Sequence, residues 1–196
     1  MKEKVRKIVF LDNIRDCNAD DALFIALRPH VYSYLSQKGF NVVSTRPYFT
    51  NESHKRILTR SAVMVKWVEE NADFLDFNLG TKDSFKNSLI FYSRFAFHYC
   101  MWVIEIVLNA VAQHEPQILS SHIPARRYSK DSYIWPEEGY AGYIIRKIAR
   151  QIGLQYEDMS TADRGSERES ILSHRSISRL ILKSIDLFCR NKLTVN

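Results

Sequence analysis

RKIVFLDN, residues 6–13, is the stretch from which the fold can be argued. A continuous apolar run, Ile8–Leu11, stops abruptly at two polar residues, Asp12 and Asn13. Short unbroken apolar runs are typical of strands that a parallel sheet buries on both faces. Apolar residues then recur at every fourth position, which predicts a helix from about Asp20 to Lys38: Leu23, Leu27, Val31 and Leu35. A strand followed by a helix is therefore the expected first unit.

The same alternation continues along the chain. We expect Gly39 to end the first helix and the β-branched pair Val42-Val43 to lie in a second strand. Further helices are predicted from Asn51 or Ser53 onward, over 83–114 and over 139–152, and further strands over 117–122 and 154–159. The final segment begins with a capping box at Ser166 and carries apolar residues at helical intervals: Ile177, Leu180, Ile181, Ile185 and Phe188.

This order of elements predicts an α/β protein with a Rossmann-like three-layer domain and a mostly parallel sheet of at least four strands. Residues 83–114 form the expected long central helix. We expect the domain to span residues 1–165. Residues 166–196 are then a C-terminal helix that packs on the domain or links it to a second one.

The composition limits the classes of function that the chain can have. The chain has 196 residues and a net charge of +6, which is compatible with anionic partners without selecting one. Its three cysteines lack a C-x-x-C spacing, so neither a zinc site nor a disulfide framework is encoded, and a cytoplasmic location is favoured. The most apolar stretch, Phe95–Ala112, contains His98, Glu105 and Asn109, which favours a buried or interfacial helix over a membrane span. We expect His98 and Glu105, seven residues apart, to be buried and internally paired.

Candidate site residues follow the predicted strands, because ligands of open parallel sheets bind beyond the carboxyl ends of the strands. Asp12 and His122 are the candidate catalytic bases. The candidate substrate-binding residues are Asn13, Arg46, Tyr48, Arg126, Arg127, Tyr133, Trp135 and Glu157. Arginine forks onto phosphate or carboxylate groups, and aromatic rings stack on sugars and bases. Each residue also has a structural interpretation, such as a turn-capping Asp12, a buried structural His122 or solvated loop arginines.

Several common signatures are missing from the sequence. It contains no G-x-G-x-x-G after the first strand and no P-loop, which disfavours dinucleotide oxidoreductases and P-loop nucleotidases. It contains no G-x-S-x-G elbow and no H-E-x-x-H pair. The sequence therefore predicts no metal and no cofactor. Basic residues are scattered along the chain, so nucleic-acid binding is disfavoured.

Five segments carry a resemblance to a known family: KIVFLDN (7–13), LSQKGFNVV (35–43), STRPYFTNESHKRIL (44–58), VIEIVLNAVAQHEPQIL (103–119) and EGYAGYIIRKIARQIGLQYEDM (138–159). Over about residues 5–160 the chain resembles the N-terminal, acceptor-side domain of GT-B-type bacterial glycosyltransferases that build surface polysaccharides. In that family a carboxylate or histidine at a strand end deprotonates the acceptor hydroxyl, and Asp12 and His122 are the positions here that match it.

The resemblance also implies partners and a location. A sugar acceptor and a nucleotide sugar are the expected ligands, and a second donor-binding domain or chain is needed for transfer, so the domain is expected to be incomplete alone. The expected location is cytoplasmic, with peripheral contact at the inner face of the membrane. The alternative is a non-catalytic α/β module that binds a nucleotide or another protein.

Overall fold

The computed structural model describes residues 5–12, 22–71, 82–122 and 137–159 and contains a five-stranded sheet. The strands are β1 (Lys7–Leu11), β2 (Ala22–Ala26), β3 (Val42–Ser44), β4 (Ile118–Ser121) and β5 (Gln155–Asp158). The helices are α1 (Pro29–Gln37), the 3-10 turn η1 (Arg46–Tyr48), α2 (Asn51–Asn71), α3 (Lys82–His114) and α4 (Glu137–Gln151). The strand order is β3-β2-β1-β4-β5, and every neighbouring pair is parallel. The predicted α/β class with a parallel sheet is therefore confirmed.

One sequence-based expectation is wrong, because the helix predicted from Asp20 to Lys38 is a strand followed by a shorter helix. The run Ala22–Ala26 forms β2 and pairs with β1 along its whole length. Proline at the first helical position starts α1 at Pro29, and Arg28 before it is extended (φ −117°, ψ 140°). The fourfold spacing of Leu23, Leu27 and Val31 therefore crosses a boundary between two elements.

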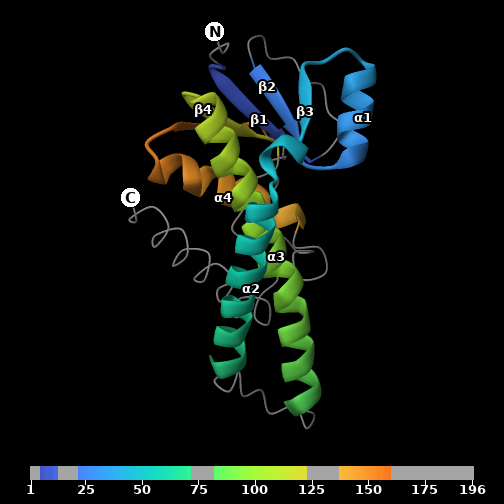
Figure 1. Ribbon diagram of the computed structural model, residues 1–196, viewed down its shortest axis with the longest axis vertical. Helices are drawn as coiled ribbons and strands as arrows, with labels where there is room; N and C mark the ends of the chain where they lie inside the picture. The colour runs from blue at the N-terminus through green and yellow to red at the C-terminus, as the bar shows by residue number, and fades with distance from the viewer. Residues whose placement is uncertain (1–4, 13–21, 72–81, 123–136, 160–196) are drawn as a thin grey trace, which may run out of the picture.

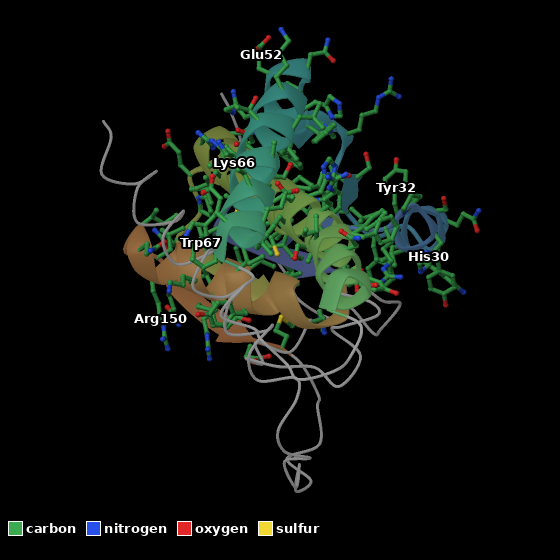
Figure 2. The ribbon with its side chains drawn as sticks, turned by 90° about the horizontal axis from the view of Figure 1, so that it is seen from below. His30, Tyr32, Glu52, Lys66, Trp67 and Arg150 are labelled. Carbon is green, nitrogen blue, oxygen red and sulfur yellow. The ribbon has the colours of Figure 1, made fainter. Side chains whose placement is uncertain are left out.

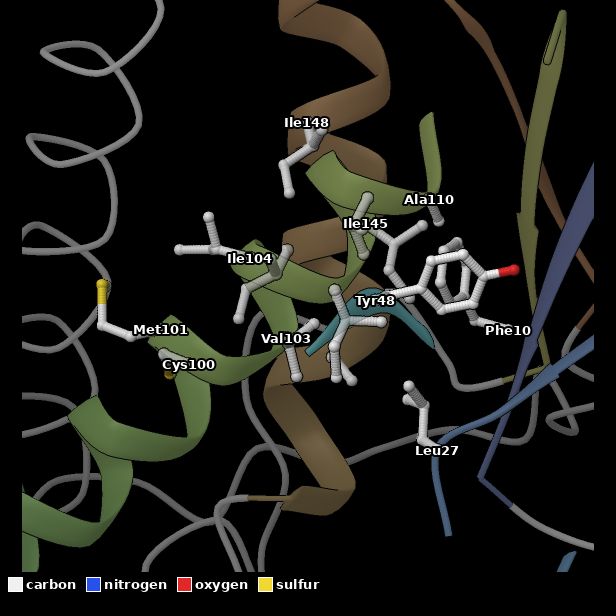
Figure 3. Packing of buried hydrophobic residues seen from close by; sticks show 14 of the residues in the cluster. Phe10, Leu27, Tyr48, Cys100, Met101, Val103, Ile104, Ala110, Ile145 and Ile148 are labelled. Carbon is white, nitrogen blue, oxygen red and sulfur yellow. The ribbon is translucent and has the colours of Figure 1, made fainter. Parts of the chain in front are cut away.

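The sheet lies between two layers of helix, as Figure 1 shows. On one face, α1 covers a small core that contains Val9, Leu11 and Phe24 with its own Val31 and Leu35. On the other face, α2, α3 and α4 pack against the alternate side chains of the same strands, including Ile8, Phe10 and Ile25. Figure 3 shows the centre of this larger core, where α3, α4 and η1 meet the sheet. The three-layer Rossmann-like arrangement is confirmed.

Two glycines end helices, as the sequence predicts. Gly39 after α1 and Gly153 after α4 have φ angles of +80° and +74°, in the left-handed region. Only glycine adopts this region without strain from a side chain. The following strands, β3 and β5, can therefore start directly beside their helices.

The two longest helices extend well past the carboxyl ends of the strands (Figure 1). At 33 residues, α3 is about 50 Å long, whereas a five-residue strand spans about 17 Å. We call the projecting parts, residues 61–71 of α2 and 82–95 of α3, the helical arm. The residues Ile90–His114 of α3 are long and apolar enough to cross a membrane, with a mean hydropathy of 1.6, and 56% of the window tested is buried inside the protein. A core helix of a globular protein has the same properties.

Candidate functional site

The strand order reverses direction between β1 and β4, which lie side by side at the middle of the sheet. From β1 the chain moves outward to β2 and β3, and it then returns through α2 and α3 to β4 and β5 on the other side. At such a reversal the two connections leave the carboxyl edge in opposite directions and open a crevice that ligands occupy. Asp12 directly follows β1, and His122 directly follows β4.

Asp12 is fixed by Arg28, which follows β2. The guanidinium Nε donates to Oδ1 at 2.5 Å, and Nη2 donates to Oδ2 at 3.2 Å. The Asp12 side chain is 12% exposed and the Arg28 side chain 36%. Arg28 therefore holds both carboxylate oxygens of Asp12 in a fixed orientation at the rim of the sheet, through the two-point hydrogen bonding that arginine and carboxylate groups favour.

His122 continues β4 by one residue. Its backbone N–H donates to the carbonyl oxygen of Phe10 at 3.2 Å, so β1 and β4 remain in register up to His122. Asp12 is the first residue after β1. The residue is 9% exposed. A neutral imidazole is a proton acceptor near neutral pH, and His122 is thus the group at this edge best suited to general-base chemistry.

Ser121 and Tyr156 provide further polar groups on the face of the sheet that α4 covers. Ser121 of β4 is in register with Asp158 of β5, and Tyr156 points to the same face two residues before Asp158. Burial raises the pKa of the Tyr156 hydroxyl, and the Asp158 charge raises it further, whereas Arg146 and the Ser121 side chain act in the opposite direction. Tyr156 therefore stays protonated and offers a hydroxyl donor near the carboxyl edge.

Sequence reasoning missed Arg28, Ser121 and Tyr156. The signal for Ser121 and Tyr156 is the two-residue alternation of β4 and β5, since Leu119 and Tyr156 both join the core under α4. Arg28 gives no such signal until β2 is recognised as a strand.

The predicted binding residues that the structure describes lie in three different places. Arg46 is exposed in η1 at the end of β3. Tyr48 is buried: its hydroxyl bonds the Nε2 atom of His114 at 2.9 Å, and its carbonyl oxygen accepts from the Asn109 amide at 2.8 Å. Tyr48 therefore fastens η1 to α3 rather than facing the carboxyl edge.

Glu157 is the third of these residues, and its carboxylate bonds the Nζ atom of Lys7 at 2.6 Å. The pair lies across β4 on the sheet face that also carries α1. The predicted residues Asn13, Arg126, Arg127, Tyr133 and Trp135 lie outside the described residues, as does the predicted domain boundary at residue 165.

Glu105 is buried, as the sequence predicts, but it pairs with two arginines of another helix, and His98, which was expected to be buried with it, is only partly buried. The carboxylate is 3% exposed and accepts from Arg56 at 2.8 Å and from Arg60 at 3.4 Å, both on α2. This bonding raises the pKa of the Arg56 guanidinium above its ordinary value. Arg56 also donates to Ser53, which bonds Asn109, so the network joins the start of α2 to the middle of α3. It is a structural connection between the two helices.

Across the described ranges, no three His, Cys, Asp or Glu side chains gather closely enough to hold a metal ion. Comparison of the chain with protein-family models, with curated proteins and with solved structures gives no match.

Proposed function

We propose that this chain is the acceptor-binding, N-terminal domain of a GT-B-type glycosyltransferase that transfers a sugar from a nucleotide sugar during surface-polysaccharide synthesis. The observation that carries the proposal is the placement of two polar groups at the reversal point of the sheet. The Asp12–Arg28 ion pair follows β1 and β2, and His122 follows the adjacent strand β4. A base and an oriented ion pair at the carboxyl ends of adjacent strands, in the crevice where parallel sheets bind ligands, suit the activation of a hydroxyl group.

In the proposed reaction, the imidazole of His122 takes the proton of an acceptor hydroxyl. The hydroxyl oxygen forms a bond to the anomeric carbon of the donor sugar, and the bond from that carbon to the phosphate oxygen breaks. The nucleotide leaves with the electron pair. The Asp12 carboxylate, held by Arg28, accepts a hydrogen bond from a neighbouring sugar hydroxyl and orients the acceptor.

In this proposal, arginine side chains bind the anionic groups of the ligands. Arg46 is exposed at the end of β3, and the segment after His122 contains Arg126 and Arg127. Tyr133 and Trp135 of the same segment supply aromatic faces for a sugar ring. The donor nucleotide sugar is held by a second domain or chain, so transfer requires that partner. A net charge of +6 supports work at the cytoplasmic side of an anionic membrane, where lipid-linked acceptors lie.

The test is a thermal-stability screen of the full chain against nucleotide sugars, free nucleotides and acidic oligosaccharides. A ligand at 100 times its dissociation constant stabilises the folded state by about 2.7 kcal/mol. We expect stabilisation by an oligosaccharide, and Arg28→Gln to weaken that binding at least tenfold. Arg150→Gln removes the same charge from the exposed last turn of α4 (Figure 2), where the helix leads to the amino end of β5 rather than to the carboxyl edge; this variant is the matched control and should bind normally. No stabilisation by any oligosaccharide would contradict the proposal.

The exposed aromatic residues of α3 favour a second candidate, a non-catalytic α/β module that binds a nucleotide or another protein. Phe91 and Phe95 are 56% and 58% exposed. Stabilisation by free nucleotides alone would support a nucleotide-binding module. In a reconstituted transferase, His122→Ala abolishes activity if the domain is catalytic, whereas an interaction module instead loses function when Trp135 or Phe188 is changed.

A further inference from the structure

The outward side of α4 carries three basic side chains and one aromatic ring. Tyr143, Arg146, Lys147 and Arg150 recur at intervals of three and four residues, so they lie on one face of the helix. Arg150 is exposed, and the other three residues are partly exposed. Figure 2 shows the side chain of Arg150 pointing away from the ribbon. We call these four residues the basic face of α4.

The opposite side of α4 is used up in the core of the protein. Ile144, Ile145 and Ile148 are buried in the larger core, where α4 packs against α3 and the sheet. From Ala141 to Gln151, no aliphatic side chain is left on the surface to enter a lipid bilayer. A partner of this helix therefore meets the basic face.

Tyr143 brings two like charges close to one another. The Cζ atom of Arg146 and the Nζ atom of Lys147 each lie 5.9 Å from the centre of its ring. The negative charge density of an aromatic face attracts cations. Two cations beside one ring repel each other, and a phosphate group that contacts both of them offsets that repulsion. The arrangement therefore favours an anionic ligand.

Carboxylates of the protein do not neutralise this surface. Four arginines elsewhere form ion pairs with carboxylates: Arg28, Arg56, Arg60 and Arg94. Among the described residues, no carboxylate forms an ion pair with Arg146 or Arg150. A cation in the last turn stabilises the end of a helix, but only Arg150 of the three basic residues lies there. Helix stability therefore does not account for the whole basic face.

We propose that the basic face of α4 binds single-stranded nucleic acid. The three basic side chains contact phosphates along the strand, and Tyr143 offers a ring on which an unpaired base stacks. Basic residues gathered along one side of a helix are the usual footprint of a nucleic-acid-binding surface. Their scatter along the sequence disfavours this function, and the fold places three of them on one surface. This inference does not depend on the proposed glycosyl transfer.

A single strand matches both kinds of group on the basic face. In a duplex the faces of the bases are covered by their neighbours, so Tyr143 has no base on which to stack. An anionic membrane supplies phosphates but no flat group, and α4 has no aliphatic side chain to insert into it. Only the single strand offers phosphates and accessible base faces together.

The test measures fluorescence anisotropy of a labelled oligonucleotide of about 20 nucleotides as the full chain is added, at salt concentrations from about 50 to 300 mM. Each phosphate contact with a single strand contributes about −0.7 to the slope of log association constant against log salt. Three cations therefore predict a slope of about −2. Lys147→Gln and Arg150→Gln should each weaken binding about threefold or more and each make the slope shallower by about 0.7.

Lys38→Gln is the matched control. The Nζ atom of Lys38 lies 5.8 Å from the ring centre of Tyr34, in the same i, i+4 arrangement as Lys147 and Tyr143. Because α1 covers the opposite face of the sheet from α4, this variant should keep the affinity and the slope of the unchanged chain. Equal weakening by Lys38→Gln and Lys147→Gln would overturn the proposal, since net charge alone would then account for binding.

Two substitutions test the ring. Tyr143→Phe keeps the aromatic face and should bind normally, whereas Tyr143→Leu should weaken binding of the single strand about threefold or more. Three results with the unchanged chain would overturn the proposal whether or not Tyr143→Leu folds. These are no binding of the oligonucleotide by about 50 µM protein at the lowest salt, equal affinity for a duplex or for inorganic polyphosphate, and binding of phosphatidylglycerol vesicles without binding of the oligonucleotide.

Discussion

The carboxylate of Glu105 connects two helices that are far apart in the sequence. It accepts hydrogen bonds from Arg56 and Arg60, and it is almost completely buried whereas both arginines are partly exposed. Replacing one member of such a pair leaves the others incompletely bonded. We therefore expect Glu105→Gln to lower the free energy of unfolding by about 2 kcal/mol, measured by urea denaturation.

The control for this prediction is Glu52→Gln in the first turn of α2. Glu52 pairs with Lys55 at 3.3 Å, but both side chains are largely exposed. Exposed pairs contribute little to stability, so this variant should unfold at the same urea concentration as the unchanged chain. An equal decrease in the free energy of unfolding for both variants would mean that the buried Glu105 pair stabilises the protein no more than the exposed Glu52 pair.

The second prediction at the residue scale concerns pH. Burial lowers the pKa of His98 below its ordinary value of 6.5, and the nearby His54 lowers it further. The unfolded chain therefore binds this proton first as the pH falls, so the stability that neutral His98 contributes is present above about pH 6.5 and is lost below it. His98→Gln should reduce the loss of stability between pH 7 and pH 5, measured by thermal melting. An unchanged slope would exclude His98 as its source.

Individual pairings could be predicted from the sequence only in part. The seven-residue spacing of His98 and Glu105 correctly placed a buried carboxylate on α3. Its partners could not be assigned, because Arg56 and Arg60 belong to a different helix and only the packing of α2 on α3 brings them near. The i, i+4 spacing of the two arginines is the signal that marks them as a joint partner.

At the scale of single elements, Thr50 caps α2. Its Oγ1 atom accepts a hydrogen bond from the backbone N–H of Ser53 at 3.1 Å, which satisfies a donor that the helix leaves open. We expect Thr50→Ala to cost about 1 kcal/mol of stability and Thr50→Ser, which keeps the hydroxyl, to cost much less. Urea unfolding of the two variants measures the difference, and equal costs would rule out the capping role.

The end of α1 supplies a prediction of a different origin. A Cβ atom at Gly39 would meet nothing within 4 Å, so only its backbone conformation, φ +80°, resists substitution. Gly39→Ala should therefore destabilise the protein by about 1–2 kcal/mol. Gly39→Asn should cost less, because asparagine tolerates the left-handed region. If both substitutions left the melting temperature unchanged, the turn would not need a glycine.

Most elements could be predicted because their patterns are local. The spacing of apolar residues and the positions of glycine and proline identify α3, α4, β4 and β5 to within two residues at each boundary. β2 could not be separated from α1 by periodicity, since Leu23, Leu27, Val31 and Leu35 keep a helical interval by coincidence. Pro29 is the physical marker of the boundary, because it fixes both its own φ and the extended conformation of Arg28. The positions of Asp12 and His122 at the carboxyl edge could be predicted, whereas that of Arg28 could not, because β2 was not recognised as a strand.

At the scale of the whole molecule, the sheet and the helical arm differ in how they are supported. β1 lies between β2 and β4 and is covered on both faces, whereas the arm projects past the sheet. We expect amides of Ile8–Leu11 to exchange with deuterium only when the whole protein unfolds, and amides of residues 61–71 to exchange through local openings of lower free energy. Faster exchange in β1 than in the arm would contradict this division.

The two outer strands of the described sheet bear on how the protein stays dispersed at high concentration. β3 has only three residues, and β5 places Glu157 and Asp158 next to each other on the opposite rim. A foreign strand that extended the sheet at β3 would find few backbone groups to pair with, and one that extended it at β5 would meet the exposed Asp158 and the Lys7–Glu157 ion pair. Aggregation by strand addition is thus opposed at both rims by different means, shortness on one and charge on the other.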